Sequence, residues 1–183
     1  MNKLFSSVLL LAALVPSVAT AQRRATKPVA TGKQEIGVDV GLAYAKPQGV
    51  DGGIQIGTPL DIRFGLRSRG QMMWEPRISL DFSTVAGATR YGIAPGVNML
   101  YSMTPGGHRR GMYLTGGAAL NILNDGQDSG VSPALNGAVG WRRPWGSGAW
   151  RYEAGLRYSF ENANVGLPSM IEIGVRLGIS LWH

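Results

Sequence analysis

Eight stretches of the chain alternate apolar residues with polar or small ones, and this repeated pattern constrains the fold more than any other feature. In the clearest stretch, residues 171–181, every odd position is Ile, Val or Leu, and the even positions are Glu, Gly, Arg, Gly and Ser. A period of two is typical of a β-strand, because successive side chains of a strand point to opposite faces. The apolar phase of all eight stretches carries no charge. The other seven stretches are residues 36–45, 60–67, 77–83, 90–101, 112–122, 131–141 and 150–160.

The N-terminus has the composition of a secretory signal peptide over residues 1–21. Lys3 gives a basic start, residues 4–18 are apolar, and Ala19-Thr20-Ala21 is a small-x-small cleavage site. We therefore expect export, a basic tail over residues 22–33, and a single barrel domain over residues 34–183. No later apolar run reaches the roughly 18 residues expected of a membrane-spanning helix.

The polar phase indicates which face of the strands points outward. It combines long Arg and Glu residues with many glycines, which weaken strands on a water-exposed face. Inside an eight-stranded barrel, by contrast, long charged side chains need small neighbours to fit. We predict a transmembrane barrel with the apolar phase facing lipid. The alternative is an exported soluble barrel, lipocalin-like, that binds a small apolar ligand in its centre.

Aromatic residues on the apolar phase lie mostly toward the ends of the stretches, where the aromatic girdles of membrane barrels lie. The predicted girdle consists of Tyr44, Tyr91, Tyr101, Trp141, Trp150, Tyr158 and Phe160. The pattern over residues 34–183 resembles the small eight-stranded outer-membrane barrels of the OmpA and OmpX type. That resemblance implies an all-β, eight-stranded antiparallel up-and-down transmembrane β-barrel in a Gram-negative outer membrane, surrounded by its lipid. Such barrels usually end in a lipid-facing aromatic residue. Here the lipid-facing phase ends in Leu181 and His183, and Trp182 lies on the opposite phase.

The polar phase also predicts a network of charges in the lumen. Buried charges persist when they are paired, and guanidinium groups suit bidentate contacts with carboxylates. Five acids and seven arginines would therefore fill the interior as a plug and leave no wide pore. The predicted lumen residues are Asp39, Asp61, Asp81, Glu153, Glu172, Arg63, Arg67, Arg77, Arg90, Arg151, Arg157 and Arg176. Pro95 and Pro133 fall within strands, where each removes a ladder hydrogen bond, and we expect bulges there.

The sequence offers no convincing catalytic, metal or cofactor site. It has no cysteine, and its two histidines, His108 in a turn and His183 at the end, lie outside any His-x-Ser strand motif. We therefore expect a protein that is not an enzyme and needs no cofactor.

The net charge of +7 is expected to be polarised between the two ends of the barrel. An even number of strands places both termini in the periplasm, together with the turns that contain Arg69, Arg109, Arg110, Arg142 and Arg143. These arginines are either ordinary solvated turn residues or contacts for anionic inner-leaflet lipid or another envelope protein. Nucleic-acid binding is not expected of an exported chain whose strand arginines lie inside. A structural, scaffold or interaction role is the remaining prediction.

Overall fold

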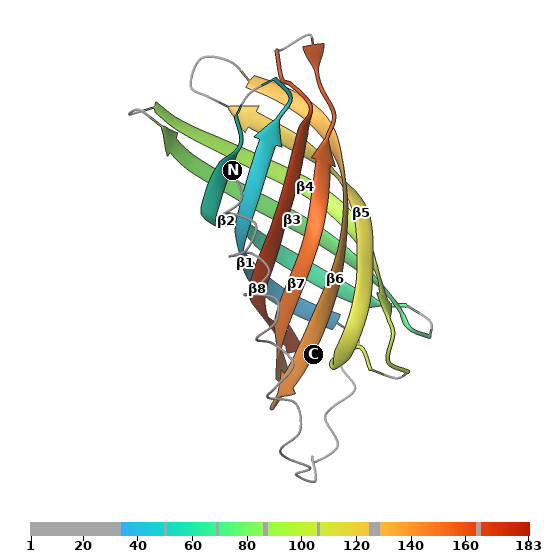
Figure 1. Ribbon diagram of the computed structural model, residues 1–183. Helices are drawn as coiled ribbons and strands as arrows, with labels where there is room; N and C mark the ends of the chain where they lie inside the picture. Colours follow the sequence, from blue (N-terminus) through green and yellow to red (C-terminus); the bar gives the residue numbers. More distant parts are fainter. Residues whose placement is uncertain are drawn as a thin grey trace, which may run out of the picture.

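The chain folds into one closed antiparallel barrel of eight strands, in which each strand pairs with the next and β8 pairs with β1 (Figure 1). The computed structural model describes residues 34–49, 51–68, 70–85, 88–105, 107–124, 129–163 and 166–183, so the expected signal peptide and tail lie outside the described residues. The predicted all-β, up-and-down barrel is confirmed. The strands are β1 Gln34–Pro47, β2 Gly53–Arg67, β3 Met72–Val85, β4 Ala88–Ser102, β5 Gly111–Asn124, β6 Ser129–Trp145, β7 Gly148–Ser159 and β8 Met170–Trp182. In the described part of the chain, no helix is both long and apolar enough to cross a membrane.

The barrel is apolar outside and polar inside. Along β1, Ile36 and Tyr44 are 44% and 46% exposed, whereas Glu35 and Asp39 are 1% exposed. The same alternation runs along β7 and β8. The alternative of a soluble barrel with an apolar centre is therefore wrong, because it requires the apolar side chains of every strand to point inward.

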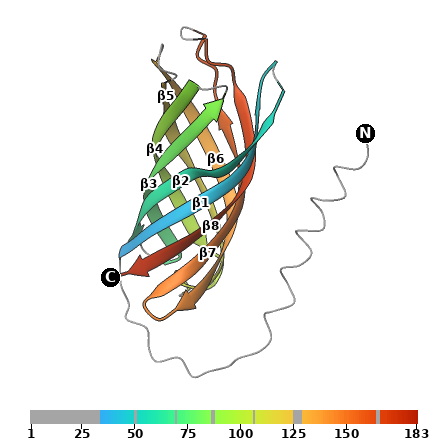
Figure 2. The ribbon, with the colours of Figure 1, turned by 90° about the vertical axis from the view of Figure 1, so that its left-hand side faces the viewer.

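Both described chain ends lie at one end of the barrel, where β1 begins and β8 finishes (Figure 2). We call this the terminal end, and it also contains the β2–β3, β4–β5 and β6–β7 connections. The β2–β3 connection contains Gly70, whose φ is 67°. The β6–β7 turn consists of residues 146–147, so Arg142 and Arg143 lie within β6 and not in a turn as predicted. The opposite end is called the loop end.

The bulges expected at Pro95 and Pro133 are absent. The β4–β5 ladder has the same register on both sides of Pro95, and Pro133 pairs with Leu120 in an unbroken β5–β6 ladder. A strand residue offers its N–H to one neighbour only, so a proline removes one bond without shifting the register. The register shift lies instead between Val40 and Leu42 of β1, opposite residues 57–59 of β2.

The β2–β3 ladder covers only the terminal half of the two strands. Its pairing runs from Arg67 with Met73 to Leu60 with Leu80. Beyond that pair, residues 53–56 pair with β1 and residues 81–85 pair with β4, but the two segments do not pair with each other. We call this gap in the ladder the open seam.

Candidate functional site

Charged side chains from six strands meet inside the terminal half of the barrel. We call them the charge network; all are buried except Arg176, whose side chain is 15% exposed. The network consists of Glu35, Asp39, Asp61, Glu75, Glu153, Arg63, Arg77, Arg142, Arg151 and Arg176. Small lumen residues make room for it: a side chain at Gly37 would overlap the Arg63 guanidinium.

The layer nearest the terminal end is built on Glu35. Its carboxylate accepts a hydrogen bond of 2.7 Å from Arg142 Nη2 and also pairs with Arg63. The Arg63 guanidinium donates from Nε to Asp39 Oδ2 at 2.7 Å and from Nη2 to Ser180 Oγ at 2.8 Å. This layer therefore ties together β1, β2, β6 and β8.

The next layer is built on Glu75 and Glu153. Glu75 Oε2 lies 2.5 Å from Arg151 Nη1, and Glu75 Oε1 lies 2.7 Å from Arg77 Nη2. Glu153 pairs with Arg151, and its Oε1 lies 3.6 Å from Arg77 Nη1. Every carboxylate of this layer thus contacts more than one guanidinium, which offsets the cost of burying the charges.

Two aromatic rings complete the network. The Tyr113 ring has the Arg142 and Arg151 guanidinium carbons each 5.0 Å from its centroid, and its hydroxyl donates to Glu153 Oε2 at 3.1 Å. Trp182 points inward, with Arg142 5.5 Å and Arg109 5.1 Å from its ring. Strand alternation therefore continues to the end of β8, and Trp182 belongs to the lumen phase.

The connection between β4 and β5 covers the terminal end of the lumen. His108 is buried there, its Nε2 lies 2.8 Å from the Gly70 carbonyl oxygen, and its own carbonyl accepts from Arg142 Nη1 at 2.6 Å. Because a carbonyl only accepts, Nε2 donates and Nδ1 is left without a proton. Burial lowers the pKa of His108 below its ordinary value.

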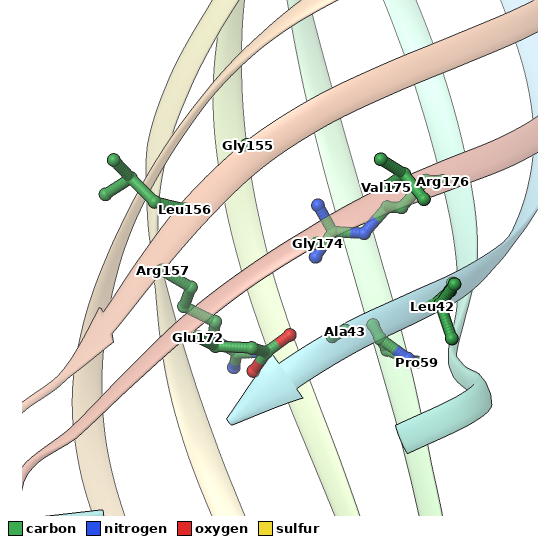
Figure 3. Close-up of a pocket in the computed structure, with 11 residues that line it drawn as sticks. Leu42, Ala43, Pro59, Gly155, Leu156, Arg157, Glu172, Gly174, Val175 and Arg176 are labelled. Atoms are coloured by element: carbon green, nitrogen blue, oxygen red, sulfur yellow. The ribbon is translucent and has the colours of Figure 1, made fainter. Parts of the chain in front are cut away.

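The loop-end half of the lumen contains a smaller polar cluster. Arg157 contacts the Asn121 side-chain oxygen, and Asn121 Nδ2 donates to Ser159 Oγ at 2.9 Å. Arg157 and Glu172, which are paired across β7 and β8, both line a cavity of about 10 Å³ (Figure 3). That volume suits about one water molecule. Among the described residues Arg157 makes no ion pair, in contrast to the arginines of the charge network.

Most predicted lumen charges lie inside, with exceptions at the strand ends. Arg67 is exposed at the terminal rim, because the lumen phase of β2 opens to water there, and it does not join the charge network. Asp81 is half-buried, and the Arg90 side chain lies outside the described residues. Sequence reasoning missed Glu35 and Glu75, although both continue the polar phase of their strands by one step.

The predicted girdle residues all lie on the outer face, at two levels. Tyr101, Trp141 and Trp150 lie toward the terminal end, where Trp74 and Trp145 are also exposed. The level toward the loop end consists of Tyr44, Tyr91, Tyr158 and Phe160.

The predicted basic end divides into exposed and buried arginines. Arg110 and Arg143 are exposed and Arg109 is half-buried. Arg142, expected in a solvated turn, is instead 1% exposed, because it lies on the lumen phase of β6. Arg69 lies outside the described residues. In the portion of the chain with described coordinates, no three His, Asp or Glu side chains are grouped to hold a metal ion.

Comparison with known proteins identifies the architecture. The structure matches that of Neisserial surface protein A (NspA) with a TM-score of 0.56 at 13% identity, covering 82% of this chain and 97% of that one. The chain has the fold of a small outer-membrane barrel. Ail, the attachment invasion locus protein of Yersinia pestis, and OprG of Pseudomonas aeruginosa give TM-scores of 0.49 and 0.46 at 10% and 11% identity. Each match covers 82% of this chain, together with 99% of Ail and 95% of OprG. No protein-family model and no curated sequence matches the chain.

Proposed function

We propose that the protein is a small outer-membrane barrel with a closed lumen and a structural, scaffold or interaction role. The observation that carries this proposal is the inversion of the barrel, with apolar side chains outside and paired charges inside. An apolar band with aromatic residues at two levels is the surface that a lipid bilayer covers. The terminal end faces the periplasm in this proposal, since both termini lie there.

A filled lumen favours a structural role over conduction. Arg63, Arg142 and Arg151 are each 1% exposed or less, and Arg142 of β6 and Arg151 of β7 reach across the lumen to Glu35 of β1 and Glu75 of β3. Two cavities beside these side chains measure about 10 Å³ each, and each suits about one water molecule. No catalytic role is part of the proposal. The exposed arginines of the basic end are its contacts for anionic inner-leaflet lipid or an anionic envelope partner.

Fractionation tests the proposed location. The full-length gene is expressed in a Gram-negative host, and the outer-membrane fraction is compared boiled and unboiled on an SDS gel. We expect the protein in that fraction, with faster migration when unboiled, because a closed barrel resists the detergent. Soluble periplasmic protein without a mobility shift would contradict the proposal.

Conductance across a planar bilayer tests the closed lumen. We expect the inserted barrel to give no stable open level. A steady ohmic conductance from the same preparation would show a continuous water path and contradict a plugged interior.

A further inference from the structure

One exposed arginine lies among tryptophans on the outer face of the barrel. Trp141, Arg143 and Trp145 occupy alternate positions of β6, so their side chains share the outward face. Trp150 of β7 is the paired residue directly opposite Arg143. The three tryptophans are 42–50% exposed. We call the three tryptophans the tryptophan cluster.

A second arginine, Arg110, lies beside this cluster, one residue before the neighbouring strand β5 begins. Arg110 immediately precedes Gly111, which pairs with Arg142, so Arg110 and Arg143 are each one residue from the same paired position. Both are exposed, and among the described residues neither forms an ion pair. Two exposed arginines therefore lie at neighbouring backbone positions at the terminal end.

We propose that Arg110 and Arg143, together with the tryptophan cluster, bind the phosphate of an anionic phospholipid in the periplasm-facing leaflet. Guanidinium forks match phosphate oxygens in a bidentate way, and tryptophan rings lie at the level of lipid headgroups. This inference rests on the proposed function, since it needs the barrel to span the membrane with its terminal end inside.

The surroundings of Arg143 favour a lipid over an anionic protein. Arg143 lies on the lipid-facing phase between rings that a bilayer would surround, so a lipid reaches it laterally. An anionic headgroup fits better than phosphatidylethanolamine, whose own ammonium cancels the charge of its phosphate. The long arginine side chain extends its charge toward the headgroup while its stem stays apolar.

The test measures lipid retention by the intact barrel. The protein is inserted into vesicles of phosphatidylethanolamine and phosphatidylglycerol, extracted in mild detergent, and analysed by native mass spectrometry for bound lipid. The wild type should retain phosphatidylglycerol in excess over its share of the vesicle. R110Q/R143Q should lose that excess, by roughly fivefold for each arginine. K46Q/R67Q removes two other exposed positive charges and should retain it.

The outcomes separate this inference from the proposed function. Equal retention by R110Q/R143Q and the wild type, or equal loss in K46Q/R67Q, would overturn the inference while the inserted, heat-modifiable barrel still supports the proposed function. An inserted wild type without any phosphatidylglycerol excess would overturn it as well. A wild type that fails to insert would contradict the proposed function and this inference together.

Discussion

Arg142 of β6 donates two hydrogen bonds, of 2.7 and 3.0 Å, to the two carboxylate oxygens of Glu35 on β1, although these strands are not neighbours in the barrel. The pair therefore crosses the lumen and ties two walls that no ladder joins. The Arg142 guanidinium also reaches the His108 carbonyl, so one side chain links the barrel wall to the connection that covers its terminal end.

Replacing Arg142 should destabilise the barrel far more than replacing its neighbour Arg143. R142Q leaves the buried Glu35 carboxylate with a single cation, and loss of one partner from a buried pair costs about 3–5 kcal/mol. R143Q removes an exposed charge and should change the free energy of unfolding by about 0.5 kcal/mol or less. Urea unfolding in lipid vesicles measures both values. Equal effects of the two substitutions would show that the Arg142–Glu35 pair contributes little.

Substitution of a lumen glycine should show how tightly the interior is packed. The added methyl group of G140A would overlap the Tyr113 ring, which is held between Arg142 and Arg151. Overpacking of this kind costs about 1–3 kcal/mol. G116A adds the same group where the nearest atom is 3.6 Å away, and it should be nearly neutral. The same unfolding measurement applies, and a neutral G140A would contradict a rigid Tyr113.

The stability of the barrel should fall at acidic pH through His108. Its pKa lies below the usual 6.5 because burial disfavours the charged ring. Above pH 6.5 the ring is neutral in both the folded and the unfolded chain, so protonation does not affect the stability there. As the pH falls below 6.5, the unfolded chain takes up the proton first, so the free energy of unfolding decreases until the folded-state pKa is reached. Unfolding at pH 7.5 and pH 5 should show a smaller loss for H108Q than for the wild type. H183Q, at an exposed terminal position, is the matched control and should behave as the wild type does.

The open seam should exchange its amide hydrogens faster than the rest of β2. In residues 53–56, the amides that face away from β1 have no paired residue on β3. Residues 60–67 bond to both neighbours and should be protected. Hydrogen–deuterium exchange in lipid nanodiscs with peptide-level mass spectrometry distinguishes the two segments. Uniform protection along β2 would mean that the ladder is complete in the membrane.

The sequence predicted the strands and their faces because a period of two, repeated eight times, is a strong signal, but it did not predict the strand ends. Glu35, Glu75 and Arg142 lie at or beyond the predicted ends of their strands. Pro76 concealed the extension of β3, and the Arg142-Arg143 pair resembled a charged turn. Individual ion pairs were also beyond prediction, since they depend on the order of strands around the barrel and on which glycines leave room. The open seam has no signal in the alternation, because it concerns backbone bonds and not side chains.

Spin labels on β8 test the inside-out barrel most directly. The chain has no cysteine, so single cysteines at Ile173, Val175, Leu177 and Ile179 can each be labelled without a background. We expect that, in lipid vesicles, all four labels collide readily with dissolved oxygen and poorly with a water-soluble nickel complex, because all four face the bilayer. Labels that are immobilised and shielded from both reagents, or open to the nickel complex, would place these residues in a protein interior or in water and contradict the inside-out barrel.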